Sequence, residues 1–333
     1  MSVRVVKPGM LTTLQDRGRI GYQRFGVVVG GAMDDWSHRA ANALVGNRQD
    51  EATLEITAVG PSLIFNEITL IAICGGDLSP RIGGEPVPQG RPVLVNAGSQ
   101  LEFGARQSGF RVYLAVHGGF DVKPTMHSRS TYLRGVFGGL NGRALRAGDE
   151  IHIGNGDAEG CYPALTQRLD RAKPTFAAAP QAFVSSSAND ALETVRIVRG
   201  EQWRAFVEKS QTAFISDDFT IGTQSDRMGY RIEGVTLKLR QPLEMLSEAV
   251  GFGTVQVPPD GNPIVLMADR QTTGGYPKIA HVASVDLPLL AQMSPRQRLR
   301  FHPIALDESQ KLYLAREQAL QDLIKSVVAW SGV

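Results

Sequence analysis

The segment from residue 266 to residue 278 combines side chains that can bind and activate a planar polar group. An apolar stretch leads into amide and hydroxyl side chains, then two glycines and a lysine. Consecutive glycines allow close approach of a ligand and expose backbone N–H donors. Gln271 can donate and accept hydrogen bonds at once, as the edge of an amide or ureido group requires, and Lys278 can stabilise an oxyanion or a phosphoryl group. The candidate substrate-binding residues here are Gln271, Thr272, Thr273, Gly274, Gly275 and Tyr276.

Two polar segments in the first half offer related chemistry. Asp16 lies in a run of hydroxyl, amide and charged residues, and Ser128-Arg129 opens a loop flanked by glycines. The loop can bind an anion through hydroxyl, guanidinium and backbone amide groups. Each segment also has a purely structural interpretation. The segment around Asp16 can be an exposed turn held by an ion pair of Asp16, and the loop that begins at Ser128 can be a flexible, solvent-exposed loop. The 266–278 segment can likewise be a polar turn at a strand end.

A fourth candidate is Asp226-Arg227, which can serve a reaction or only form an ion pair at a strand start. His117 and His281 lie near the polar segments, but an isolated histidine is more often structural than catalytic. Cys74 stands in an apolar run and is expected to be inert core.

Several classes of protein are excluded by what the sequence lacks. No glycine directly precedes a lysine, so there is no Walker A loop. The sequence also contains no Met-Lys pair, which is the usual context of a biotinylated lysine. The sequence contains no His-x-x-x-His pair, so a transition-metal site is not predicted. Its two cysteines are too few for a disulfide scaffold. A net charge of +2 argues against a nucleic-acid surface. The N-terminus lacks an apolar leader, so we expect a cytoplasmic protein.

The polar segments lie between short stretches rich in β-branched residues, each bounded by Gly, Pro or Asn. Such stretches are typical of strands, so the sequence predicts a mainly β fold with a few helices. Gly83-Gly84 predicts a hairpin turn. The expected strands of the first half cover residues 3–6, 63–65, 68–74, 92–96, 100–103 and 109–116. The expected helices cover residues 34–45, 202–209 and 309–330.

The length of 333 residues exceeds what one hydrophobic core normally supports, which is about 250–300 residues. Ala, Pro and Ser dominate residues 166–192, which predicts a linker. The expected domains are therefore 1–165 and 193–333, the second with the C-terminal helix. Motifs recur in the same order on both sides of the linker, which predicts two copies of one β module. The paired segments are 19–22 with 227–230, 75–82 with 274–279, and 99–103 with 298–301.

Longer motifs run along essentially the whole chain: Pro8-Gly9, the segment Thr12 to Tyr22, Gly30-Gly31-Ala32-Met33-Asp34, Ala41 to Asn47, Leu54-Glu55-Ile56, Gly60-Pro61, Ser128 to Tyr132, Asp226 to Arg231, and Gln271 to Pro277. Together these motifs resemble the allophanate hydrolase subunit 2 family, also described as the biotin-dependent carboxyltransferase subdomain A and B family.

The resemblance implies two cyclophilin-like β-barrel domains that arose by internal duplication. It implies the C-type subunit of a bacterial ATP-dependent 5-oxoprolinase, active only in a complex with a B-type subunit that completes the site and an A-type subunit. ATP with Mg²⁺ would act in that complex. Two alternatives remain open: a carboxyltransferase component acting on urea-like substrates, with biotin carried by another protein, and a non-catalytic antagonist of a kinase inhibitor.

Resemblance and chemistry together assign expected roles to the candidate residues. Arg227 and Lys278 would neutralise developing or phosphoryl charge, and Asp226 and Asp16 would act as a base or position the substrate. Ser128 and Arg129 would hold an anionic part of the substrate, such as a carboxylate. The segment 271–276 would orient the amide or ureido group.

Overall fold

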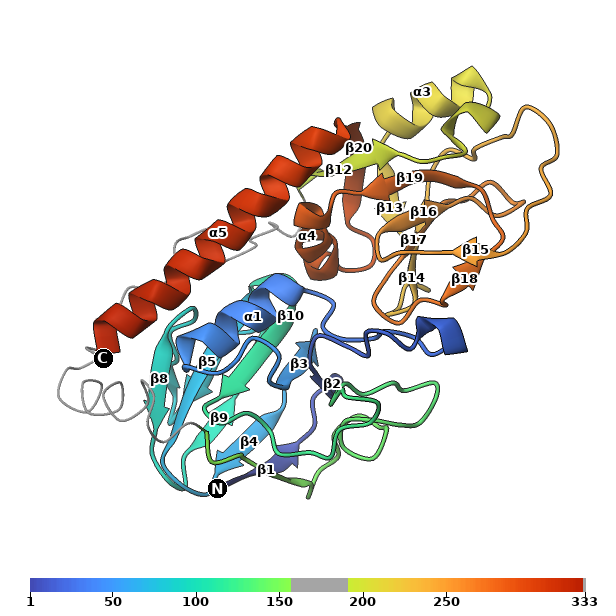
Figure 1. The fold of residues 1–333 in the computed structure, drawn as a ribbon. Coiled ribbons are helices and arrows are strands. Elements are labelled where there is room, and N and C mark those ends of the chain that lie inside the picture. The colour runs from blue at the N-terminus through green and yellow to red at the C-terminus, as the bar shows by residue number, and fades with distance from the viewer. Residues whose placement is uncertain (157–190, 332–333) are drawn as a thin grey trace. The chain divides into compact units, whose positions relative to one another are not determined.

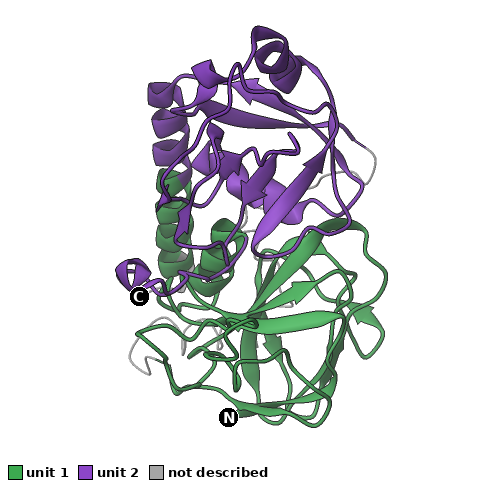
Figure 2. Ribbon diagram, turned by 90° about the vertical axis from the view of Figure 1, so that its right-hand side faces the viewer, with its two compact units in different colours: residues 1–18, 34–186, 317–333 green, residues 19–33, 187–316 purple. Residues whose placement is uncertain are grey.

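The computed structural model describes residues 1–156 and 191–331, and strands dominate it (Figure 1). The predicted linker 166–192 lies outside the described residues, except for its last two. By contacts the chain forms two compact units (Figure 2). Unit 1 comprises Met1–Gly18, Asp34–Ser186 and Glu317–Val333, and unit 2 comprises Arg19–Met33 and Ser187–Arg316.

These units differ from the predicted domains in two segments. Residues 19–33 belong to unit 2, because Met33 is fully buried in its core. Residues from Glu317 onward belong to unit 1, where Glu317 forms an ion pair with Arg39 at 2.6 Å. Both attachments join parts of the chain that are distant in sequence.

Unit 1 contains two antiparallel sheets around one hydrophobic core. Their strand orders are β11-β1-β4-β9-β6-β7 and β2-β3-β10-β5-β8. The strands of the first sheet are β1 (Ser2–Lys7), β4 (Ser62–Phe65), β6 (Arg81–Ile82), β7 (Glu85–Pro86), β9 (Gln100–Glu102) and β11 (Glu150–His152). Those of the second are β2 (Leu11–Gln15), β3 (Thr53–Thr57), β5 (Thr69–Asp77), β8 (Pro92–Val95) and β10 (Ser108–Val116).

Alternation along the strands of unit 1 separates an apolar face from a polar one. In β3, Leu54 and Ile56 enter the core, whereas Glu55 between them points to the other face and is also buried. Helix α1 (Asp35–Leu44) packs on β5 and β10, with Asp34 as its N-cap. The predicted strands, the hairpin between β6 and β7, and the helix at 34–45 are thus confirmed.

Unit 2 contains a closed barrel of seven strands in the order β12-β19-β16-β17-β14-β13-β20, closed by parallel pairing of β12 with β20. Its strands are β12 (Glu193–Arg199), β13 (Phe219–Ile221), β14 (Gly229–Glu233), β16 (Thr254–Gln256), β17 (Ile264–Leu266), β19 (Lys278–Val282) and β20 (Arg298–Pro303). A small two-stranded ribbon, β15 (Glu248–Ala249) with β18 (Thr273–Gly274), lies outside the barrel sheet. The predicted mainly β class is confirmed.

The helices of unit 2 correct one prediction. Residues 202–209 do not form one helix: a 3₁₀ turn, η3 (Trp203–Ala205), ends at Phe206, and α3 (Glu208–Ser216) begins later. Phe206 has an extended backbone and pairs with Leu239 as a β-bridge, and its side chain is fully buried. Burial of this aromatic ring outweighs the local helical pattern.

The remaining helices of the described residues are η1 (Gln23–Phe25), η4 (Ser284–Asp286), α4 (Leu287–Gln292) and α5 (Leu306–Ser331). Helix α5 contains the predicted C-terminal helix, and in unit 1 its side chains Leu320, Leu323 and Val327 are buried. No helix in the described part of the chain combines the length and apolarity needed to cross a bilayer.

The recurring motifs do not all fall on the same kind of element. Residues 19–22 form a turn, whereas Gly229 and Tyr230 begin strand β14. Gly75 and Gly76 lie within β5, whereas Gly274 ends the short strand β18. Residues 99–103 and 298–301 both supply strands, β9 and β20.

Candidate active site

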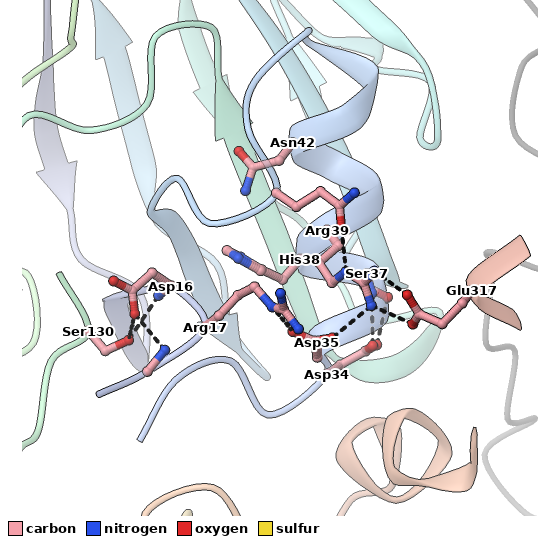
Figure 3. A network of polar contacts seen from close by, with 12 residues as sticks. Asp16, Arg17, Asp34, Asp35, Ser37, His38, Arg39, Asn42, Ser130 and Glu317 are labelled. Atoms are coloured by element: carbon pink, nitrogen blue, oxygen red, sulfur yellow. Dashed lines mark hydrogen bonds and ion pairs between the residues drawn. The ribbon is translucent and has the colours of Figure 1, made fainter. Parts of the chain in front are cut away.

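In unit 1, the end of β2 and the loop at 128–130 meet through one buried carboxylate. Asp16 accepts hydrogen bonds from the hydroxyls of Ser128 (2.7 Å) and Ser130 (2.5 Å) and from the backbone N–H groups of Gly18 (2.8 Å) and Arg129 (2.5 Å). Figure 3 shows Asp16 facing Ser130. The structure therefore brings together three predicted residues, but the Asp16 carboxylate is occupied in fixing the loop.

The guanidinium of Arg129 also has partners within the fold. Its Nε donates to the carbonyl oxygen of Val122 at 3.2 Å, and its Nη1 lies 3.5 Å from Oε2 of Glu51. The Ser128 side chain is almost completely buried. This geometry supports the structural interpretation of the loop more than the binding of an outside anion.

A second polar network in unit 1 surrounds the start of α1 (Figure 3). Arg39 contacts Asp35 at 3.2 Å and holds both carboxylate oxygens of Glu317 at 2.6 Å. Asp34 caps the helix by accepting from the backbone N–H (2.9 Å) and hydroxyl (2.6 Å) of Ser37. These contacts anchor α1 and the last part of α5 to each other.

Beneath α1 the polar face of the second sheet carries buried groups that sequence reasoning did not select. The Tyr113 hydroxyl donates to Oε2 of Glu55 at 2.7 Å and accepts from the backbone N–H of Asp34 at 2.8 Å. Burial raises the pKa of Tyr113 well above its usual value. Burial also lowers the pKa of His38, whose Nδ1 lies 2.8 Å from the hydroxyl of Thr53. An ionisable residue between two core residues of a strand, as in Leu54-Glu55-Ile56, is the sequence signal for this layer.

In unit 2, Arg227 and Asp269 form a buried bidentate ion pair. The distances are 2.9 Å from Nε to Oδ2 and 3.0 Å from Nη2 to Oδ1, and Nη2 also donates to the carbonyl oxygen of Gly31 at 2.6 Å. Each of the two side chains is 7% exposed. The neighbouring Asp226 is exposed, and its carboxylate accepts the backbone N–H groups of Met228 (2.8 Å) and Gly229 (3.2 Å). Asp226 thus shapes the turn into β14.

The predicted segment 271–278 forms a ribbon with residues 248–250. Glu248 pairs with Gly274, Ala249 pairs with Thr273, and the backbone N–H of Val250 donates to the carbonyl oxygen of Thr272 at 3.2 Å. The ribbon places the Glu248 carboxylate against the Nζ of Lys278. The Lys278 side chain is 6% exposed and that of Glu248 is 54% exposed, so this ion pair lies at the rim of the protein.

The backbone at Gly274 packs against the side chain of Gln256, a contact that the sequence analysis did not foresee. A Cβ there would lie 2.6 Å from Nε2 of Gln256, so the Gln256 amide fills the space beside the backbone. Gln256 is 2% exposed, and its register partner in β19 is Lys278. The backbone N–H of Lys278 in turn donates to Oε1 of Gln202 at 3.0 Å. The structure thus places two glutamine side chains and one carboxylate around the predicted lysine.

A cavity of about 860 Å³ in unit 2 borders this ribbon. Predicted residues Gly275 and Tyr276 line it together with Pro277, and Tyr276 is 45% exposed. Its remaining wall consists of residues 236–245 and 257–261. Lys278 follows the lining residue Pro277 in the chain, and we take the cavity together with the Lys278–Glu248 pair as our candidate site.

This region offers hydrogen-bond donors and three cationic side chains: Lys278, whose partner Glu248 is exposed, and Lys238 and Arg240 in the cavity wall. Such groups suit stabilisation of negative charge on a carbonyl or phosphoryl oxygen. Within residues 1–156 and 191–331, no group of three or more His, Cys, Asp or Glu side chains is arranged to hold a metal ion.

Comparison with known proteins places the chain in one family. The carboxyltransferase domain, subdomain A and B, family matches residues 25–303. The chain is 38% identical over 316 residues to the C-type subunit of 5-oxoprolinase from Haemophilus influenzae, covering 95% of both chains. It is 36% identical over 326 residues to the C-type subunit of 5-oxoprolinase from Escherichia coli K12, covering 96% of this chain and 97% of the other.

A solved structure agrees with these matches. The crystal structure of the Kluyveromyces lactis urea carboxylase superposes with a TM-score of 0.87 at 28% identity, covering 97% of this chain and 29% of that one. The predicted resemblance is confirmed, and the chain belongs to the carboxyltransferase domain, subdomain A and B, family.

Proposed function

We propose that this chain is the C-type subunit of an ATP-dependent 5-oxoprolinase, which opens the lactam ring of 5-oxoproline to glutamate. The observation that carries the proposal is the identity of 36–38% to two proteins of that name, over at least 95% of both chains in each case. The proposal includes an A-type and a B-type subunit, with ATP and Mg²⁺ acting in the assembled complex.

The chemistry of the reaction explains what this chain must supply. A lactam is stabilised by resonance, so attack by water requires charge to build up on its oxygen. Transfer of the γ-phosphoryl group of ATP to that oxygen, with release of ADP, would activate the ring carbon for attack by water. The ring C–N bond would then break and its nitrogen would take up a proton, and hydrolysis of the acyl phosphate so formed would release glutamate and phosphate. A cation near the oxygen lowers the energy of the charged species. We propose that Lys278 is this cation.

Exposure of the Glu248 side chain supports the role of Lys278. The carboxylate is 54% exposed, so its separation from the lysine costs little solvation energy. Gln271, Thr272 and Thr273 would orient the lactam amide, and the backbone N–H of Gly275 is a further donor beside the cavity.

The test is release of glutamate from 5-oxoproline by A-type and B-type subunits, with ATP and Mg²⁺, in the presence and absence of this chain. We expect turnover only with all three proteins. Lys278→Ala should fold normally and reduce turnover at least tenfold, whereas Lys209→Ala, at an exposed position of α3, should not. Equal turnover with and without this chain would refute the proposal, and wild-type turnover by Lys278→Ala would remove Lys278 from the site.

The similarity to urea carboxylase favours one alternative function, a carboxyltransferase component that takes carboxyl groups from biotin carried by another protein. The two functions differ in what they consume. ATP-dependent release of glutamate without any biotinylated protein supports the 5-oxoprolinase. Carboxylation of a urea-like substrate that requires a biotinylated carrier supports the alternative.

A further inference from the structure

Arg270 stands at the start of the candidate segment, and its charge has no carboxylate partner in the part of the chain that the structure describes. Its Nε and Nη1 reach only backbone carbonyl oxygens, those of Val250 and Met267, each at the long distance of 3.4 Å. The guanidinium carbon lies 5.7 Å from the ring centroid of Phe252. The guanidinium is therefore held loosely, by neutral groups alone.

The charges around Arg270 explain why it is left unpaired. Asp269, its neighbour in the chain, accepts hydrogen bonds from Arg227 with both carboxylate oxygens. Glu248, on the ribbon strand that leads to Val250, faces Lys278. These two ion pairs occupy the carboxylates of Asp269 and Glu248, so neither is bound to Arg270.

Arg270 is also accessible enough to receive a ligand. The residue is half-buried, and its Nη2 makes no hydrogen bond but is not sealed from solvent. Burial lowers the pKa of Arg270 to about 10, and the nearby Asp269 offsets this only in part. A cation that has lost water without gaining a counter-ion is stabilised when an anion binds.

We propose that Arg270 binds the carboxylate of the substrate. The inference rests on the proposed function, because 5-oxoproline carries one carboxylate beside its lactam ring. The planar guanidinium fork matches a carboxylate through two parallel hydrogen bonds. Gln271, the proposed amide-recognising residue, follows Arg270 directly in the chain. This assignment replaces Arg129, whose guanidinium is already held by Glu51 and Val122.

The experiment compares two substrates in the complete complex: 5-oxoproline and 2-pyrrolidinone, the same lactam without the carboxylate. We expect Arg270→Gln to raise KM for 5-oxoproline at least 30-fold while kcat changes less than threefold and KM for ATP is unchanged. The preference of the enzyme for 5-oxoproline over 2-pyrrolidinone, in kcat/KM, should fall at least tenfold. Arg270→Lys keeps the charge without the fork and should recover part of the affinity.

Arg231→Gln is the matched control, because it removes an arginine from an exposed position on β14 of the same barrel. It should leave both kinetic constants unchanged. Arg270→Gln removes an unpaired cation, so its thermal unfolding midpoint should equal or exceed that of the wild type; if it fails to fold, the Arg270→Lys kinetics decide. An unchanged KM in Arg270→Gln, or a rise in KM in Arg129→Gln instead, overturns the inference while the proposed function stands. A wild-type complex that does not turn over 5-oxoproline overturns both.

Discussion

Replacement of Arg227 by methionine tests whether this residue holds the barrel together or takes part in the chemistry. The side chains of Arg227 and Asp269 are each 7% exposed and share hydrogen bonds of 2.9 and 3.0 Å. Methionine retains much of the volume but leaves the Asp269 carboxylate buried without its cation. Removal of one partner from a buried ion pair costs about 3–5 kcal/mol. We expect the free energy of unfolding of unit 2 to fall by this amount.

Arg300 provides a matched control in the same barrel. It also binds an aspartate through two nitrogens, with distances of 3.0 and 2.6 Å to Oδ1 of Asp218, but its side chain is 46% exposed. Water replaces the lost partner at such a site, so Arg300→Met should cost about 0.2–1 kcal/mol. The double variant Arg227→Met, Asp269→Leu removes both buried charges and should regain most of the stability lost by the single variant.

The assay is urea unfolding followed by the fluorescence of Trp203, which is 8% exposed and belongs to the core of unit 2. Trp36 and Trp330 are replaced by phenylalanine so that only unit 2 is reported. The reasoning is refuted if Arg227→Met costs no more than Arg300→Met, or if the double variant is no more stable than Arg227→Met. Turnover of the stable double variant then shows whether Arg227 also serves the reaction.

Three further predictions concern unit 1. Burial raises the pKa of Cys74 to about 12, so in a Cys161→Ser background a thiol reagent at pH 8 should label the chain only after denaturation; labelling of the native protein at the rate of a free thiol would contradict this. Burial lowers the pKa of His38 below 6.5, so as the pH falls the imidazole is protonated in the unfolded chain before it is protonated in the folded one. The free energy of unfolding should therefore decrease as the pH drops below about 6.5, by at most about 1.4 kcal/mol per pH unit. His38→Asn should lose less stability than the wild type between pH 7.5 and 5.5, as measured by urea unfolding, and equal losses would refute the assignment. Glu317→Gln weakens the two hydrogen bonds to Arg39 and should cost about 1–2 kcal/mol, seen as a lower thermal midpoint, and an unchanged midpoint would show that the pair contributes nothing.

Much of the local structure is predictable because short patterns determine it. The helix at 34–45 has its capping aspartate and its stop signal in the sequence itself, and the hairpin between β6 and β7 follows from Gly83-Gly84. The expected helix at 202–209 is wrong because Phe206 forms an isolated β-bridge with the distant residue Leu239 and has an extended backbone. Local propensity is a weak signal when a large side chain can be buried instead.

Contacts between distant residues explain why the candidate site was only partly predictable. The polar segment 271–278 was recognised from its composition, but Glu248, which is 30 positions from Lys278, carries no signal of its own in the sequence. The same holds for the partnership of Arg227 with Asp269, 42 positions apart. Residue type shows that a side chain can carry charge, whereas only the fold shows which charges neutralise each other.

Pairing and exposure together rank the cationic candidates of unit 2 for chemistry. Arg227 is paired with Asp269, and both side chains are buried. Separation of this pair would leave two charges in the protein interior, which solvates them poorly. Lys278 is bound to a carboxylate that is 54% exposed, which water can solvate when a substrate displaces it. Arg270 has no carboxylate to displace among the described residues. The free-energy cost of separating each cation from its present partner therefore rises from Arg270 through Lys278 to Arg227. An anionic ligand should bind most readily to Arg270, less readily to Lys278 and least readily to Arg227.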